Sequence, residues 1–549
     1  MFIKRNISKR GDKTYNSILL VQGERVPQPR APGRPRKGEK PKSKVVHRTL
    51  ANLSKLPETL LSLIEGYCKA ARQGEPLEVL PPGVEPVVGR AYGPMAALLA
   101  LARELGLERV LGTSRLASLA LFLVLARVLH QGSRLSAVRW AQTQAVAETL
   151  GLGEFDEDDL YAALDWLATE QPRIERELAG QHMPGAVFLY DVTSSYLEGQ
   201  KNELAAAGYN RDGKRYKKQI VVGLLTDANG EPVSVQVYEG NRADPTTVAD
   251  QVNKLAKNFA ATEVVLVGDR GMLKTEGRQL LSEQGFRFVT ALTDPQVRKL
   301  LSEGTLQMEL FTEKVSEVTS PEGLRYILRR NPAALERHRA RRADQLARVQ
   351  SKVEARNAWL EKHPRASAEV SLKNAERWLR TYKLHAYVTP RLEERRVVLE
   401  VSTECQREVE LLDGCYAVIS DVPGEKASAQ QVWERYGDLQ QVERDFRDMK
   451  TGLLEIRPLF LRKASRTRGH ALVSMLALKL VRELRRRVRP LGLTVSDAVD
   501  RLEAVRLVSL ADPGLGLWRL PTRWDKPQQE VLKVLPPLPA PVLSRRTAA

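Results

Sequence analysis

The sequence predicts an α/β fold, in which a mixed sheet is preceded by a helical N-terminal domain and interrupted by a long insertion of strands and helices. Three observations predict it. Apolar residues follow helical spacing over 94–180. Short runs rich in β-branched residues then alternate with helical segments over 186–292. The helical pattern of the core resumes only at about residue 427, so residues 293–426 are predicted to form the insertion.

Composition bounds the class of protein. The chain has 549 residues, enough for about three or four domains, and its 42% hydrophobic content excludes a mostly disordered chain. The longest apolar run, 116–129, is too short to span a bilayer, and the first residues lack the apolar segment of a signal peptide. The three cysteines form no Cys-x-x-Cys pair, which argues against disulfides and zinc. We therefore expect a cytoplasmic protein without a membrane partner.

Positive charge is concentrated in three blocks. The formal net charge is +19, yet residues 1–50, 325–382 and 462–489 carry +11, +9 and +9, so the remaining residues are acidic overall. A polyanion would be bound at three separate places, and nucleic acid fits such a distribution better than an anionic membrane does. The alternative for each single block is an ordinary solvated surface.

The first block contains a linker over residues 30–44 that is rich in Pro, Gly and basic side chains, between short predicted strands within 1–29 and 45–50. Within it, Gly33-Arg34-Pro35-Arg36 resembles the core of an AT-hook, an extended segment that places arginines in the minor groove of DNA. Arg34 and Arg36 are therefore candidate DNA-binding residues. A plain basic linker is the alternative.

The helical N-terminal domain is predicted over residues 51–184. Leu98, Leu101 and Leu105 follow a three-to-four spacing, and residues 116–129 are apolar nearly all round, which indicates a buried helix. A further helix is expected over 158–180. DNA binding is one candidate function of this domain.

The core is predicted to begin at residue 185, with a first part over 185–292 and a second part over 427–490. A hairpin signal, Ala228-Asn229-Gly230, joins its second and third strands. The expected elements are strands 186–190, 219–227 and 232–238, a helix capped by Asp244 and ending near 259, strand 263–268, helix 274–284 and strand 286–292. This is the element order of an RNase H-like core, in which the fourth strand lies parallel beside the first.

The insertion over 293–426 is predicted to surround a helical stretch, 333–380, with strand-like pieces at 306–318, 323–330, 383–389, 395–402 and 415–421. Leu346, Val349, Val353 and Leu360 form a narrow apolar seam on the helical stretch, and arginines occupy much of the remainder. We expect these arginines to contact DNA. The alternative is a solvent-facing or dimer-forming coiled coil. Residues 491–549 are left as a C-terminal tail region.

Two aspartates follow predicted strands. Asp191 ends the first strand and Asp269 ends the fourth. A single acid at a strand end is uninformative, because strand ends are polar. If the two strands are neighbours in the sheet, however, both carboxylates converge at one edge.

A third acid lies on a helix predicted over 430–450. At 100° per residue, Glu443 falls within the apolar stripe that contains Val432, Tyr436 and Phe446, whereas the other acids of this helix lie opposite. A buried carboxylate is costly unless it is paired or bound to a metal, and a buried ion pair with Lys450 or an arginine is the alternative. Three converging carboxylates could hold two divalent cations, with Mg²⁺ or Mn²⁺ favoured over zinc by oxygen ligands.

Five segments together resemble the bacterial insertion-sequence transposases of the DDE class: YDVTSSYLEG, GYNRDGKRYKKQIVVGLLTD, YEGNRADPTTV, VGDRGM and YGDLQQVERDFRDMK. The resemblance covers about residues 185–490, including RTRGH at 466–470, and points to the branch with a Tyr-x2-Arg-x3-Glu-x6-Lys signature. Tyr436, Glu443 and Lys450 match that signature in type and spacing. Leu439 stands at the Arg position, so the DNA contact of that Arg is not carried over.

The resemblance implies an enzyme that binds the terminal inverted repeats of its element, cleaves the DNA backbone at the ends and joins the freed 3′-hydroxyls to target DNA. It implies metal-binding catalytic roles for Asp191, Asp269 and Glu443 with two Mg²⁺ or Mn²⁺ ions, and DNA contacts for Tyr436, Arg447 and Lys450. It also implies a homodimer on paired ends, an insertion that positions the transposon end, and a bacterial protein that associates with the nucleoid when bound to DNA.

Three other functions remain open from the sequence. Asp191-Val192-Thr193 is similar to the nucleophile loop of haloacid-dehalogenase-type phosphatases, but Thr193 stands where that family needs a second Asp. A catalytically inactive, transposase-derived DNA-binding protein is the main alternative. A nuclease that cleaves without joining would share the same active site.

Overall fold

The structure is a computed structural model. It describes the chain except residues 12, 28–42, 74–84, 181–186, 200, 210, 212, 215, 260–262, 451, 455, 457–458, 513–515 and 542–549. Arg34 and Arg36 lie outside the described residues, so their DNA binding stays a prediction.

The core is a mixed sheet that contains five strands in the predicted order: β5 (Val187–Tyr196), β6 (Gln219–Asp227), β7 (Pro232–Glu239), β8 (Val265–Gly268) and β9 (Arg287–Ala291). β5, β6 and β7 form an antiparallel meander, β8 lies parallel beside β5, and β9 lies parallel beside β8. This topology confirms the predicted α/β class with an RNase H-like core.

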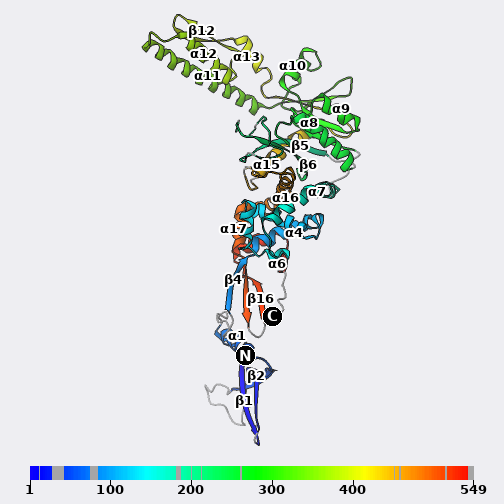
Figure 1. Cartoon of the computed structure of the whole chain (residues 1–549), viewed down its shortest axis with the longest axis vertical. Helices are drawn as coiled ribbons and strands as arrows, with labels where there is room; N and C mark the ends of the chain where they lie inside the picture. The colour runs from blue at the N-terminus through cyan, green and yellow to red at the C-terminus, as the bar shows by residue number, and fades with distance from the viewer. Residues whose placement is uncertain are drawn as a thin grey trace, which may run out of the picture.

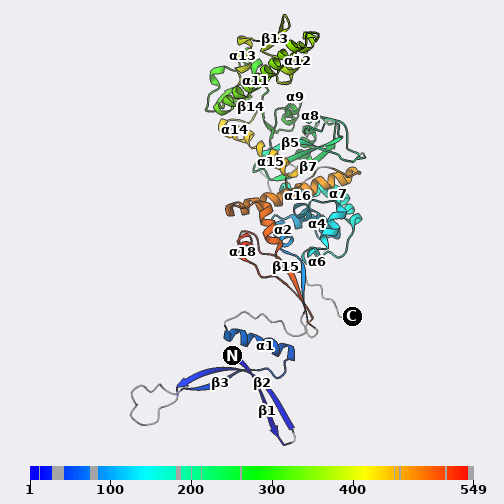
Figure 2. The same ribbon diagram turned by 90° about the vertical axis from the view of Figure 1, so that its left-hand side faces the viewer.

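Helices cover both faces of this sheet (Figures 1 and 2). On one face, α8 (Asp244–Asn253) and α9 (Thr275–Glu283) pack onto the sheet through apolar residues such as Val248 and Leu281. On the other face lie α7 (Glu157–Gly180) and the long α16 (Ala464–Val488). α16 lies between the sheet and the helical domain, so both bodies share one continuous apolar core.

Three more strands extend the sheet beyond β9, in the order β14 (Cys415–Ser420), β11 (Arg325–Arg330) and β10 (Ser316–Thr319). All three are antiparallel to their neighbours. The ends of the insertion therefore belong to the core sheet. The strand expected over 306–318 is wrong for most of its length, because residues 308–310 form a 3₁₀ turn and β10 begins at Ser316.

The remainder of the insertion is a separate lobe at the top of Figure 1, and contains α11 (Pro332–Lys362), α12 (Ala368–Thr381), β12 (Val388–Glu393), β13 (Arg396–Val401) and α13 (Thr403–Glu410). Val349 and Val353 of the apolar seam are buried against α12 and the β12–β13 hairpin. Because the chain itself covers the seam, no coiled-coil partner is needed to bury it. α10 (Asp294–Ser302) follows β9 in the chain and precedes β10.

The helical N-terminal domain contains α2 (Gly93–Glu104), α3 (Leu107–Leu111), α4 (Arg115–Leu129), α5 (Arg134–Ala141), α6 (Val146–Leu150) and α7. α4 is buried almost throughout, as its apolar composition predicts. Within the described part of the chain, no single helix could cross a membrane by length and composition. Only α4 and α5 taken together, with a 92° bend between them, pass that test.

The C-terminal region is not a separate tail. α17 (Val495–Glu503) and α18 (Lys526–Lys533) pack against the helical domain. β15 (Arg506–Asp512) pairs with both β16 (Gly516–Pro521) and β4 (Glu85–Ala91), a strand that the sequence did not predict within 51–184. The pairing of β15 with β4 joins segments more than 400 residues apart, which periodicity within one segment cannot indicate.

The N-terminal module lies beyond this domain in both views and contains β1 (Phe2–Arg10), β2 (Lys13–Pro27), β3 (Ser43–Asn52) and α1 (Glu58–Gln73). Its three strands form an antiparallel sheet with β2 in the centre. The linker with the AT-hook resemblance connects β2 to β3.

Candidate active site

Asp191 lies in the middle of β5. The expectation that the strand ends at Asp191 is wrong, because the strand continues through Tyr196. Its polar continuation does not read as a strand, yet Ser194 and Ser195 are fully buried against β6. Alternation along the strand directs Tyr190 to the α8 and α9 face, so Asp191 points to the opposite face, toward the helix α15 (Leu439–Lys450).

Asp269 follows β8 directly. Gly268 of β8 is paired in parallel register with Tyr190, so the two aspartates lie at neighbouring positions of adjacent strands. The Asp269 carboxylate accepts a hydrogen bond from the backbone N–H of Arg270 at 2.8 Å. The predicted convergence of the two strands at this edge is confirmed by the sheet order.

Glu443 lies on a helix that differs from the predicted one. The continuous helix over 430–450 is wrong: the chain forms α14 (Ala429–Gly437) and α15 (Leu439–Lys450), separated at Asp438. The break changes the helical phase, and the buried stripe of α15 centres on Val442.

The expectation that Glu443 is buried is therefore also wrong. Glu443 lies beside the stripe and is exposed, whereas Asp445, expected on the opposite face, is only 2% exposed. The fold nevertheless turns Glu443 toward β5.

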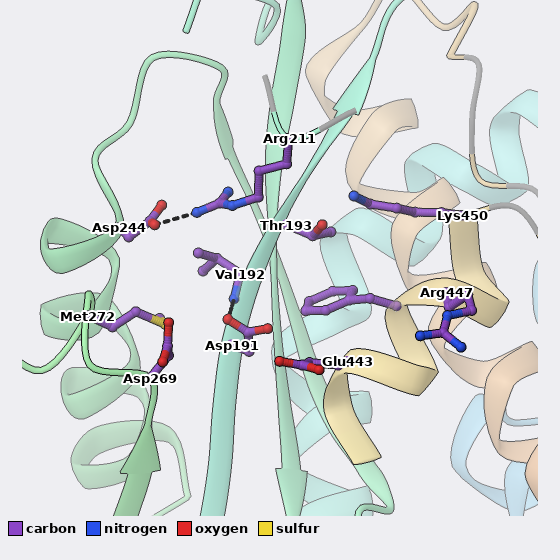
Figure 3. A pocket seen from close by; sticks show the side chains of 11 residues that line it. Asp191, Val192, Thr193, Arg211, Asp244, Asp269, Met272, Glu443, Arg447 and Lys450 are labelled. Carbon is purple, nitrogen blue, oxygen red and sulfur yellow. Dashed lines mark hydrogen bonds and ion pairs between the residues drawn. The ribbon is translucent and has the colours of Figure 1, made fainter. Parts of the chain in front are cut away.

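Asp191, Asp269 and Glu443 line one cavity of about 410 Å³. Figure 3 shows Asp191 between the other two carboxylates. The three come from β5, from the end of β8 and from α15, segments that lie up to 252 residues apart in the sequence. The remaining lining residues are Val192, Thr193, Arg211, Asp244, Met272, Phe446, Arg447 and Lys450.

Charge repulsion and burial act together on Asp191. Burial, and to a smaller extent the negative charges of Asp269 and Glu443, together raise the pKa of its carboxyl to about 7, while the Val192 N–H and Arg211 oppose the shift. Asp191 thus lies close enough to the other two acids to sense their charges.

Three cations line the same cavity. Arg211 forms an ion pair with Asp244, while Arg447 and Lys450 enter from the C-terminal half of α15 (Figure 3). Positive side chains around a carboxylate cluster can bind the anionic oxygens of a phosphate group. The cavity therefore places three carboxylates beside three positively charged side chains.

Tyr436, at the end of α14, is bound to the cluster. Its hydroxyl donates a hydrogen bond to a carboxylate oxygen of Asp269 at 3.3 Å, and burial raises its pKa above the ordinary range of a phenol. The tyrosine therefore orients Asp269. Whether it also contacts DNA stays a prediction.

Comparison with known protein families identifies the family to which this domain belongs. The family described as transposase DDE domain matches residues 183–480, which span β5 to most of α16 and include all three acids. The chain belongs to this family. Its members are the DDE transposases.

Two other comparisons add little. The transposase shares 9% sequence identity with the cryo-EM structure of a piggyBac transposase synaptic complex with hairpin DNA, at a TM-score of 0.37, covering 75% of this chain and 77% of that chain. A comparison with characterised proteins found no match.

The transposase brings its three acids into one cavity without bringing them to metal-binding distance. Among the residues that the structure describes, no three His, Cys, Asp or Glu side chains lie close enough together to hold a metal ion. Asp191 and Asp269 each accept a hydrogen bond from the next backbone N–H through one carboxylate oxygen. The donor set still fits a hard divalent cation, since all three groups are carboxylates and the repulsion at Asp191 would be offset by positive charge.

Two lining residues were missed by the sequence reasoning. Asp244 was assigned as a helix N-cap, but Ala243 holds that position and Asp244 pairs with Arg211 instead. No periodic pattern or motif spacing in the sequence distinguishes Arg211 from the other arginines. Both lie within segments that resemble the family, GYNRDGK and GNRADP, and this was the only available signal.

Proposed function

We propose that this transposase binds the terminal inverted repeats of an insertion sequence, cleaves the DNA strands at its ends and joins the freed 3′-hydroxyls to target DNA. The observation that supports the proposal is the cavity shared by Asp191, Asp269 and Glu443 within the family domain.

In this proposal the three carboxylates hold two Mg²⁺ or Mn²⁺ ions. When bound, such ions activate the attacking oxygen and stabilise charge on the leaving oxygen of an in-line displacement at phosphorus. The chain's own groups have separate tasks. Lys450, Arg447 and Arg211 bind phosphate oxygens at the cavity rim, and the Tyr436 hydroxyl keeps Asp269 oriented.

The substrate is double-stranded DNA, and the synaptic form is a homodimer that holds two ends. The basic blocks supply phosphate contacts outside the cavity, including those of the AT-hook-like Arg34 and Arg36. The protein would act in the bacterial cytoplasm, associated with the nucleoid when bound to DNA.

The experiment uses the purified full chain, labelled DNA that carries the inverted repeats flanking the gene, and a supercoiled target plasmid. We expect labelled ends to appear in the plasmid with Mg²⁺ or Mn²⁺ and to disappear with a chelator. Glu443→Gln should be inactive, while Glu434→Gln, an exposed acid on α14, should retain activity. Cleavage without joining would instead identify a nuclease. Binding without cleavage would identify an inactive DNA-binding derivative.

A further inference from the structure

A second cavity lies outside the active site, between the helical domain and the core. It encloses about 340 Å³. α4 and α5 contribute Arg127 and Arg134, and α16 contributes His470. Ile456, Leu459, Phe460 and Leu461, which follow α15 in the chain, also line it. A volume of this size falls within the range of small-molecule sites in proteins.

Arg134 is the unusual group in this cavity. It is 8% exposed, and its Nη2 donates a hydrogen bond to Nδ1 of His470 at 2.8 Å. Its Nε has no hydrogen-bond partner among the residues that the structure describes, and no ion pair to it is found there. A buried guanidinium is normally paired, because removing its charge from water is costly.

The surroundings do not supply the missing negative charge. Burial and the nearby arginines Arg134 and Arg127 hold the pKa of His470 well below its usual range. The ring is therefore neutral, and its Nδ1 accepts a hydrogen bond from Arg134. Arg127, 6% exposed, donates to the carbonyls of Gln131 and Leu454. None of the described residues that line the cavity is acidic. The part of the cavity beside Arg127 and Arg134 is thus suited to an anion.

The cavity also has apolar and aromatic lining residues. Phe460 is 69% exposed at its rim, and Tyr161 lies inside with the guanidinium of Arg466 stacked at 4.4 Å from its ring centroid. An exposed aromatic side chain beside buried cations is the combination that binds a nucleotide, because the ring stacks on the base while the cations bind the phosphate.

The position relative to the active site is also favourable. Leu459, beside Phe460, pairs with Leu197 at the end of β5, six residues beyond Asp191. At ~3.3 Å per residue this places the cavity about 20 Å from the carboxylates along the strand. A DNA strand that leaves the active site can therefore reach it.

We propose that this cavity is a nucleotide-binding site, in which Arg134 and Arg127 bind a phosphate group and Phe460 stacks on the attached base. Its occupant is a nucleotide of the DNA strand bound at the active site, and this part rests on the proposed function. The phosphate and base contacts themselves apply equally to a free nucleotide.

The test measures binding without metal and without cleavage, so that its failure is separate from failure of the transposase activity. The full chain is titrated calorimetrically with dAMP, deoxyadenosine and inorganic phosphate. We expect dAMP to bind at least about tenfold more tightly than deoxyadenosine, because a charge-assisted hydrogen bond to phosphate is lost with the nucleoside. Absence of dAMP binding at millimolar concentration overturns the proposal.

Variants assign the contacts. Arg134→Met should weaken dAMP binding about tenfold or more, while Arg139→Met, at an exposed arginine of the same helix, should leave it unchanged. Phe460→Ala, at an exposed position that does not threaten the fold, should weaken dAMP binding about tenfold and leave phosphate binding unchanged. Unchanged dAMP binding in Phe460→Ala, or in a folded Arg134→Met, overturns the site.

The source of the nucleotide is decided by competition. Two transposon-end DNAs compete with dAMP for the wild-type protein, one long enough to reach beyond the active site and one too short. If only the longer DNA displaces dAMP, the occupant is a nucleotide of the DNA. DNA of either length that fails to displace dAMP overturns the DNA source and leaves a free nucleotide as the occupant.

Discussion

Arg482 of α16 holds Asp445 of α15 with one guanidinium nitrogen: Nη1 donates to both carboxylate oxygens, at 2.8 and 2.9 Å. The same guanidinium donates to Glu231 through Nε and to the carbonyl of Asn229 through Nη2, in the hairpin between β6 and β7. Asp445 lies two residues from Glu443. The arginine therefore fixes the helix that carries the third acid against both α16 and the sheet.

Arg482→Met should destabilise the protein by about 3–5 kcal/mol, because it leaves the 2%-exposed carboxylate of Asp445 buried without its partner. Urea unfolding monitored by circular dichroism measures the change. Arg486→Met, at an exposed arginine one turn along, is the control and should cost less than about 1 kcal/mol. A similarly small loss in Arg482→Met would mean that α15 is held by its apolar face alone.

Glu443→Gln should abolish cleavage and leave binding to the inverted repeats within about a factor of two. Glu443 is exposed in the cavity, and no ion pair joins it to any other described residue. We therefore expect the variant to keep its fold. Gel-shift and cleavage assays on the same DNA separate the two effects. Equal losses of binding and cleavage would indicate that Glu443 acts in DNA binding rather than in chemistry.

Lys450→Ala should slow cleavage by a factor corresponding to about 3–4 kcal/mol at most, because one preorganised donor at the phosphate is lost. Its affinity for Mn²⁺ and its melting temperature should stay close to those of the wild type, since the carboxylates remain. Single-turnover rates and Mn²⁺ titration provide the measurement. If Mn²⁺ binding is lost instead, the lysine positions Glu443.

The exposed arginines of α11 should contact DNA. Replacing Arg337 and Arg341 by Gln removes two charges from a surface outside the apolar core of the lobe. The slope of log affinity against log salt for end DNA should fall by about two units if both contact phosphates. Arg109→Gln combined with Arg139→Gln, two exposed arginines of the helical domain, is the matched control. Equal slopes in the two double variants would show that α11 faces away from DNA.

Acid should destabilise the protein through His470. Burial and the charges of Arg134 and Arg127 hold its pKa well below 6.5 in the folded state, so protons bind more strongly to the unfolded chain. The stabilisation from the neutral ring is complete above pH 6.5 and is lost as the pH falls below it, by about 1 kcal/mol between pH 6.5 and 5.5.

Comparison with His470→Gln isolates this effect. The variant should lose that part of the pH dependence of its unfolding free energy, whereas His385→Gln, at an exposed histidine, should retain it. Parallel curves for His470→Gln and the wild type would exclude His470 as the titrating group.

The amino-acid sequence was enough to predict the order of the core elements and the three carboxylates that come together. Apolar runs and the Asn229-Gly230 turn are local signals, and β6 to β9 form close to where they indicate, whereas β5 continues past its apolar run to Tyr196. The family segments identified Asp191, Asp269 and Glu443, which the fold places in one cavity.

Features that depend on contacts between distant segments could be seen only in the folded protein. The burial of Asp445 in place of Glu443 and the pairing of Arg211 with Asp244 each involve a partner more than 30 residues away in the chain. The same holds for β4, which forms as a strand beside β15. Periodicity reports which face of a segment is apolar, but a buried charge is stable only where the fold supplies its partner, and no local pattern contains that partner.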